Sequence, residues 1–216
     1  MIVEKEKKLI QIINTIESQI SIINDRYRKG PDLYFYRKII NLRSSYKSIE
    51  TFLQKKENIE ALYATLLSWD MNCRGAKMKY YDEFEENIIN CLSHFIKIEE
   101  LSRNNPIDFI LLNDTLRESY NKLDLMLTNC KFVSNAKILH FLFPELLMPM
   151  DGTNTLNFFY NNTGESVHKY IEIINFQFEI MNSTKKLRQY LDNNWNLTIP
   201  KMIDNAIIII QGVSIK

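Results

Sequence analysis

The amino-acid sequence predicts an all-α protein, and three observations support this fold class. The 216 residues include only five glycines and five prolines, so residues that interrupt regular structure are scarce. Apolar residues recur at intervals of three and four, which places them on one face of a helix. No segment shows the alternation of apolar and polar residues that is typical of a half-buried strand. We therefore expect a single globule of about nine to ten helices.

Helical periodicity begins near residue 3 and continues, with breaks, through the first half of the chain. Gly30 ends the first amphipathic segment, and Asp32 is a candidate N-cap for the second. Further on, Asn104-Asn105-Pro106 forms a boundary, with Pro106 expected in the first turn of the next helix. The segments expected to be helical in this half are residues 3–27, 33–53, 58–71, 81–101 and 106–127.

The second half continues the pattern and completes the expected domain organisation. Two apolar helices are expected within residues 132–160, joined by a turn that contains prolines. Three further helices are expected at residues 165–181, 184–195 and 200–212. Residues 1–56 are expected to form an N-terminal helical hairpin, packed on a main all-α domain of residues 57–216.

Charge and composition limit the partners and the location. A net charge of +1 gives no whole-protein argument for binding nucleic acid or an anionic membrane. The longest aliphatic run, residues 206–210, is far shorter than the ~20 residues of a membrane span. Charges directly after the first residue, with no cleavage site, argue against a signal peptide. We therefore expect a cytoplasmic protein with no membrane partner.

Asp151 is the acidic residue that local structure is most expected to hold in place. Pro149 precedes it, and Gly-Thr-Asn-Thr-Leu follows, so Asp151 suits the N-cap of the next helix. A capping aspartate keeps one free oxygen, which allows a second role as a general base or cation ligand. On the preceding helix, Lys137 and His140 are candidate partners. For His140 a buried, hydrogen-bonded role is the alternative to carrying protons to Asp151.

A second candidate element spans residues 69–77, Trp-Asp-Met-Asn-Cys-Arg-Gly-Ala-Lys. Gly75 suits the left-handed residue that ends a helix, where Arg74 and Lys77 would complement the negative end of the helix dipole. Alternatively, Arg74 reaches Asp151 or a bound phosphate, because a guanidinium holds both in bidentate geometry. On this interpretation Trp69, Arg74 and Lys77 bind a ligand in a pocket between helices.

These two elements carry two resemblances. Together, the Trp-x-Met-x-x-Arg-Gly turn and the Pro-Met-Asp segment resemble a group of uncharacterised prokaryotic proteins. The order of helix, turn, Pro-x-Asp and helix is similar to the helix-hairpin-helix DNA glycosylase superfamily, in which a lysine on the hairpin precedes an essential aspartate. Phe132 and Ser134 stand where that family has its hairpin glycines, and its lysine position falls on Ala136. The resemblance implies a two-lobed fold with a helix-hairpin-helix-like centre, and association with DNA without the family's full catalytic apparatus.

The alternative is a helical module that binds a small anionic ligand or a protein partner in a pocket near Arg74 and Asp151. No phosphate-binding loop, nucleophile elbow, metalloprotease motif or dinucleotide fingerprint is present, so no cofactor is expected. Cys91 and His94 are spaced like half of a zinc site, but no second pair accompanies them. We therefore expect no metal site, and the sequence leaves open whether the protein is an enzyme.

Overall fold

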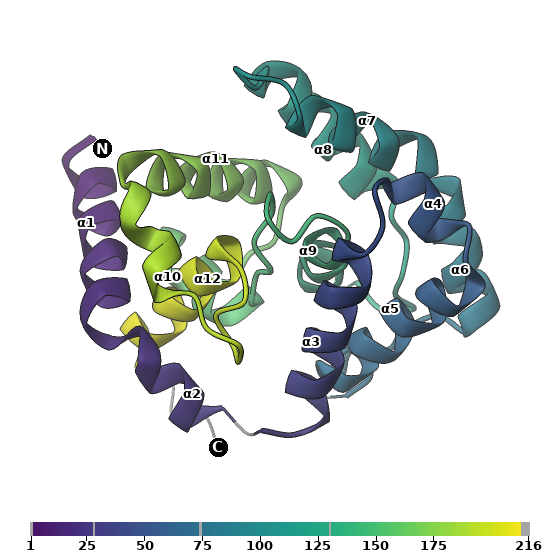
Figure 1. Cartoon of the computed structure of the whole chain (residues 1–216), viewed down its shortest axis with the longest axis horizontal. Helices are drawn as coiled ribbons and strands as arrows, with labels where there is room; N and C mark the ends of the chain where they lie inside the picture. Colours follow the sequence, from purple (N-terminus) through teal and green to yellow (C-terminus); the bar gives the residue numbers. More distant parts are fainter. Residues whose placement is uncertain (1, 28, 74, 130, 213–216) are drawn as a thin grey trace.

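The computed structural model describes residues 2–27, 29–73, 75–129 and 131–212, and this part of the chain is built of helices (Figure 1). It contains twelve α-helices, ten of which have seven or more residues. The same ranges hold no strand, only an isolated bridge between Met78 and Met126. The predicted all-α class is therefore confirmed.

The helices follow one another with short connections. In the first half they are α1 (Ile2–Gln19), α2 (Ile23–Arg26), α3 (Pro31–Ser44), α4 (Ile49–Leu53), α5 (Lys56–Ser68), α6 (Tyr81–Asn90) and α7 (Leu92–Ser102). In the second half they are α8 (Phe109–Lys122), α9 (Lys131–Leu142), α10 (Gly152–Tyr160), α11 (Val167–Ser183) and α12 (Ile199–Ile210). Two 3-10 helices, Ile20–Ile22 and Lys185–Tyr190, complete the regular structure of the described ranges.

Two expected helix starts were placed wrongly. Gly30, not Asp32, is the N-cap of α3, and Asp32 lies in the first turn of that helix, after a proline. Pro106 lies ahead of α8, which Asp108 caps by accepting a hydrogen bond from the Leu111 amide at 3.0 Å. Asp108 accepts from a first-turn amide and so sets the start of α8, whereas Gly30 has no side chain with which to cap α3, and Asp32 accepts from the Leu33 amide at 3.0 Å within the first turn.

The prediction of a helix at residues 184–195 is also wrong after residue 190. The chain forms only the 3-10 helix and then an irregular segment that leads to α12. In that segment one oxygen of Asp192 accepts hydrogen bonds from the amides of Asn194 and Asn196, at 2.7 and 3.1 Å. An aspartate that bonds the backbone ahead of it favours a turn over a helix, which explains the difference.

The first two long helices pack against different parts of the molecule. Helix α1 packs along α12, whereas α3 packs against α5 and α9. Figure 1 shows α1, α10, α11 and α12 on one side, the α3 to α7 helices on the other, and α9 between them. The principal contacts of α1 and α3 are thus with separate groups of helices.

Helices α9 and α12 form the interior. Nine of the twelve residues of α9 are buried, and every residue of α12 except the last is buried. Both sequences are apolar on most sides, which is typical of a helix surrounded by other helices. The polar residues that these two helices carry are therefore removed from water, and each needs a partner inside the protein.

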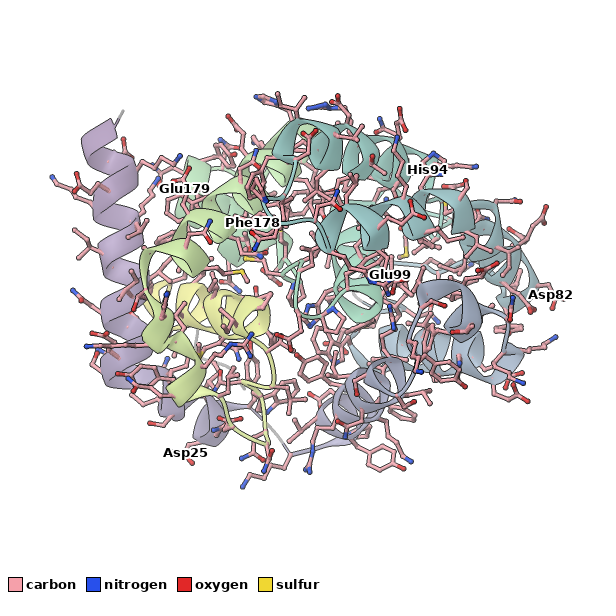
Figure 2. All side chains as sticks on the ribbon, turned by 45° about the horizontal axis from the view of Figure 1, so that its top comes forward. Asp25, Asp82, His94, Glu99, Phe178 and Glu179 are labelled. Carbon is pink, nitrogen blue, oxygen red and sulfur yellow. The ribbon has the colours of Figure 1, made fainter. Side chains whose placement is uncertain are left out.

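A buried ion pair connects the helices around α9. The Arg43 guanidinium donates to Glu99 at 2.5 Å and to the Leu142 carbonyl oxygen at 2.9 Å. Glu99 also accepts from the Ile49 amide, which opens α4. Figure 2 shows Glu99 among the side chains between helices, while Asp82 points outward. This pair links α3, α4, α7 and the end of α9. Removal of Glu99 alone would leave the buried Arg43 guanidinium without its carboxylate.

Phe141 provides a test of this core. Its side chain is fully buried, and its ring contacts the rings of Tyr36 and Trp69. We expect Phe141→Ala to lower the free energy of unfolding by about 3–5 kcal/mol, because it removes apolar contacts and leaves a cavity. Urea unfolding followed by tryptophan fluorescence measures this. A loss below about 1 kcal/mol, typical of a surface site, would show that α9 is not the centre of the core.

Candidate functional site

Asp151 begins α10 as the predicted N-cap. Its Oδ1 accepts a hydrogen bond from the Asn154 amide at 2.7 Å, and its own amide donates to the Thr155 hydroxyl at 3.2 Å. These bonds fix the direction of a half-buried carboxylate. No described residue donates a hydrogen bond to its Oδ2, so this oxygen remains able to accept one from a ligand.

Lys137 reaches the same region from α9. Its Nζ donates to the Trp69 carbonyl oxygen at 2.8 Å and lies 3.4 Å from the sulfur of Met71. The ammonium also lies 5.6 Å from the centre of the Trp69 ring. Burial lowers the pKa of Lys137 to about 8, although the negative charge of Asp151 opposes this shift. Lys137 therefore carries a proton that is unusually easy to lose.

The sequence analysis missed a second lysine and its carboxylate partner, both on α12. Lys201 and Asp204 are only 4% and 3% exposed, and the Lys201 Nζ lies 2.7 Å from Asp204 Oδ2. Burial raises the pKa of Asp204, and the nearby Lys201 ammonium opposes this. Two charged residues in a helix that is otherwise almost entirely apolar were the available signal, because lysine and aspartate are rarely buried unless paired.

Three aromatic rings surround the Lys201 ammonium. Its Nζ lies 5.2 Å from the centre of the Trp69 ring, 5.8 Å from that of Tyr27 and 6.0 Å from that of Trp195. Cation–π attraction of this kind is strongest when the cation is withdrawn from water, as it is here. The Trp69 ring thus contacts both lysines, and it connects the Lys137 side of the region to the Lys201 side.

These side chains line one cavity of about 640 Å³, which we call the central cavity. Its walls come from the turn after α2, the end of α5, the first half of α9, the start of α10 and the inner face of α12. The residues that matter for its chemistry are Tyr27, Asp32, Trp69, Asp70, Lys137, Asp151, Glu165, Trp195, Lys201 and Asp204. The cavity therefore combines aromatic surface with charges of both signs.

Two buried polar atoms at this cavity have no hydrogen-bond partner in the described part of the chain. They are Oδ1 of Asp204 and the indole nitrogen Nε1 of Trp195. Each belongs to a residue that lines the central cavity and is only 3% exposed. A buried acceptor and a buried donor without partners are costly for a fold, and in a cavity they are typical of a surface that binds a polar ligand.

The structure brings some of the predicted site residues together and separates others. Trp69, Lys137 and Asp151 line the central cavity. Lys77 is exposed and does not line it; its backbone pairs with Leu127 beside the isolated bridge. Arg74 lies outside the described residues.

His140 lies in the core and does not line the cavity. Its Nδ1 is 2.6 Å from the Leu147 carbonyl oxygen, so this nitrogen carries the proton and donates it. Nε2 lies 3.2 Å from the Tyr36 hydroxyl, and is left to accept. Burial lowers the pKa of His140 to about 3. This geometry favours the structural role over the transfer of protons to Asp151.

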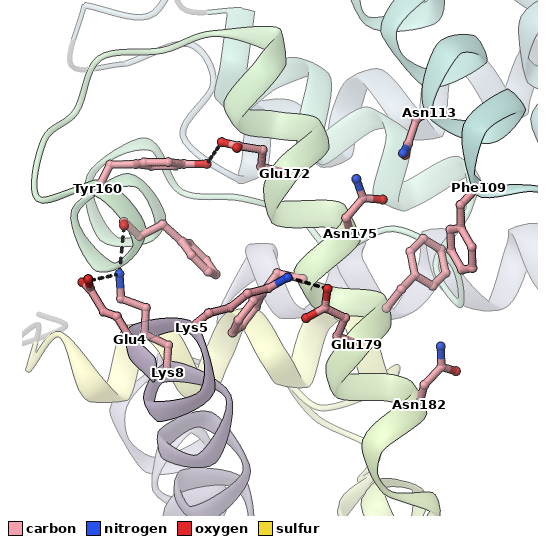
Figure 3. Close-up of a pocket in the computed structure, with 13 residues that line it drawn as sticks. Glu4, Lys5, Lys8, Phe109, Asn113, Tyr160, Glu172, Asn175, Glu179 and Asn182 are labelled. Atoms are coloured by element: carbon pink, nitrogen blue, oxygen red, sulfur yellow. Dashed lines mark hydrogen bonds and ion pairs between the residues drawn. The ribbon is translucent and has the colours of Figure 1, made fainter. Parts of the chain in front are cut away.

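A larger cavity, of about 870 Å³, lies between the start of α1, the end of α10 and one face of α11 (Figure 3). Its charged groups are already paired with one another. Lys5 bonds Glu179 at 2.5 Å, and the Tyr160 hydroxyl donates to Glu172 at 2.7 Å. Because these interactions engage its charged groups, the larger cavity offers less chemistry than the central one, although the buried Oδ1 of Asn113 in its wall has no partner in the described part of the chain.

Cys91 and His94, which are spaced like half of a zinc site, are not joined by further metal-binding side chains among the described residues. Burial raises the pKa of the Cys91 thiol to about 11, so it is protonated at neutral pH. His94 faces Glu118 at 3.9 Å. Among the described residues no cluster of three or more histidine, cysteine or acidic side chains is arranged to hold a metal ion. Nor does any helix in these ranges have the length and apolar character needed to cross a bilayer.

Comparison with protein-family models, with curated proteins and with solved structures gave no significant match. Functional interpretation of this chain therefore depends on the chemistry of the central cavity.

The environment of His140 predicts a specific dependence of stability on pH. Below its ordinary pKa of 6.5, the unfolded chain takes up a proton that the folded protein does not. Stability from this residue is therefore complete above about pH 6.5 and is lost as the pH falls, by roughly 3 kcal/mol at about pH 4. We expect His140→Gln to be less stable at neutral pH, yet to lose less stability on acidification.

Urea unfolding across this pH range measures the effect. His168→Gln is the matched control, because His168 is exposed and faces Glu172 on the surface of α11. Equal acid sensitivity of the wild type and the His140 variant would contradict the assignment of His140 as a neutral core residue.

Proposed function

We propose that this protein is a helical ligand-binding module whose site is the central cavity. A single observation carries the proposal: Lys137, Asp151, Lys201 and Asp204 line one cavity together with three aromatic rings. Its walls present acceptors and donors that the described part of the protein leaves unused, namely Oδ1 of Asp204 and Nε1 of Trp195. Aromatic walls with a few convergent polar groups are typical of sites for small ligands.

A thermal-shift screen with metabolite amines, carboxylates, phosphates and nucleosides tests this function. A ligand at about 100 times its Kd stabilises the native state by roughly 2.7 kcal/mol. For a domain of this size we expect the melting temperature to rise by about 5–10 °C. The shift should shrink in Lys137→Met, which removes a donor from the wall, and in Asp151→Asn, which removes a negative charge from it.

Lys131→Met provides the control on the same helix. Lys131 pairs with Asp124 at 2.9 Å on the surface and does not line the central cavity. A ligand whose thermal shift is the same in Lys137→Met as in the wild type binds elsewhere. A screen in which no compound shifts the melting temperature would contradict the proposed function.

Association with DNA is a second candidate, motivated by the resemblance to helix-hairpin-helix glycosylases. Its support is that Lys137 and Asp151 line the same cavity, beside rings on which a base could stack. On this proposal α9, its connection to α10, and α10 itself form a helix-hairpin-helix-like centre of a two-lobed molecule. At the start of α9 the Phe132 amide donates to Glu165 at 3.2 Å, so a DNA phosphate would compete with that carboxylate.

Filter binding with duplex and single-stranded DNA tests the second candidate. If the protein binds DNA, retention should be strong at about 50 mM salt and fall steeply towards 200 mM, because phosphate contacts release counterions. Glu165→Gln should strengthen binding, since it removes a negative charge that competes with phosphate. Absence of retention at every salt concentration would exclude this candidate and leave the small-ligand function standing.

A further inference from the structure

The charges that line the central cavity are predominantly negative. Among the described residues of its wall, two lysines accompany the carboxylates of Asp32, Asp151, Glu165 and Asp204. Burial raises the pKa of Asp204, and the negative charge of Asp151 adds to this, as expected for two carboxylates that line one cavity and repel one another. A positive charge placed between them would relieve this repulsion, whereas an anion would add to it.

The aromatic part of the same wall already accommodates a cation. Tyr27, Trp69 and Trp195 surround the ammonium of Lys201 at 5.2–6.0 Å from their ring centres. The protein thus stabilises one alkylammonium group in this environment by ring faces and a carboxylate. The combination of ring faces and carboxylates is suited to a second organic cation.

The unused atoms define the rest of the ligand. Asp204 Oδ1 is buried without a partner, and Asp151 Oδ2 receives no hydrogen bond from the described residues, so both can accept from an amine. Two donors are also available. Trp195 Nε1 has no hydrogen-bond partner, and Lys137 donates one of its three ammonium hydrogens to the Trp69 carbonyl oxygen. A ligand that satisfies all four carries amine protons at one end and an acceptor atom elsewhere.

We propose that the central cavity selects a protonated, ring-bearing organic amine, whose ammonium is held by Asp151 and Asp204 and whose ring stacks on the aromatic wall. This inference deepens the proposed ligand-binding function and rests on it. It favours the cation that Asp151 suggested over the small anion that Arg74 suggested, because the cavity also contains the carboxylates of Asp204 and Glu165.

Three probes with the same ring and different charge test the inference on the full chain. They are tryptamine, which is cationic, indole-3-ethanol, which is neutral, and indole-3-acetate, which is anionic. In isothermal titration calorimetry we expect tryptamine to bind about tenfold or more tighter than the alcohol, because its hydrogen bonds to carboxylates are charge-assisted. The acetate should bind most weakly of the three.

Asp151→Asn is the decisive variant, since asparagine caps a helix as well as aspartate does and the fold is retained. It should remove most of the preference for tryptamine over the alcohol, because the charge that distinguishes the two ligands is gone. Glu172→Gln is the control, because Glu172 lies at the larger cavity. Tryptamine binding that is unchanged in Asp151→Asn would overturn the proposal.

The pH dependence gives an independent readout. The charged groups that act on Lys137 are Asp151, Lys201, Asp204 and Asp70. Because the Lys137 ammonium repels a cationic ligand, tryptamine affinity should rise as the pH increases through about 8, where Lys137 loses its proton. Aliphatic amines keep their proton up to about pH 10, so the ligand remains charged throughout. In Lys137→Met this rise should disappear.

The outcomes separate this inference from the function on which it rests. A preference for the neutral or the anionic probe, reduced by Lys137→Met, would overturn the selection of a cation and keep the cavity as a ligand site. If none of the probes binds at millimolar concentration, the inference fails. The proposed function then stands or falls with the wider thermal-shift screen.

Discussion

The burial of the Lys201–Asp204 pair is the constraint around which the interior of this protein is arranged. Withdrawing two opposite charges from water costs several kcal/mol for each ion, and only close pairing and further favourable contacts offset it. Here the contacts come from distant parts of the chain. Tyr27 follows α2, Trp69 follows α5, and Trp195 precedes α12. One ammonium on α12 thus holds together three segments that have no local reason to meet.

The same arrangement explains why the region is both rigid and chemically incomplete. One carboxylate oxygen of Asp204 accepts a hydrogen bond from Lys201, and the other has no partner. Lys137 is held in place by a hydrogen bond to the Trp69 carbonyl oxygen. The polar groups are therefore fixed by the fold before any ligand arrives. Preorganised groups of this kind lose little entropy on binding, which favours affinity even for a small molecule.

Local features of the fold were predictable from the sequence, and contacts between distant residues were not. The capping role of Asp151 follows from the residues on either side of it, and the helical class follows from spacing alone. Lys137 and Asp151 were also grouped correctly, because a short proline-containing turn joins their helices. By contrast, the partnership of Lys201 with Tyr27 and Trp195 depends on how α12 packs, which no local pattern encodes. The failed helix at residues 184–195 is an exception with a local cause, since Asp192 bonds the backbone just ahead of it and stabilises a turn that helix propensity does not reveal.

The packing of α1 along α12 brings the first and the last described helices together, and α12 supplies one wall of the central cavity. During synthesis the ribosome releases the chain from its first residue onward, so Trp69 and Lys137 emerge well before Lys201. Until α12 has emerged, the aromatic rings that will surround its lysine have no cation to enclose. The cavity is therefore completed last, and a nascent chain interrupted before α12 lacks the wall that carries Lys201 and Asp204.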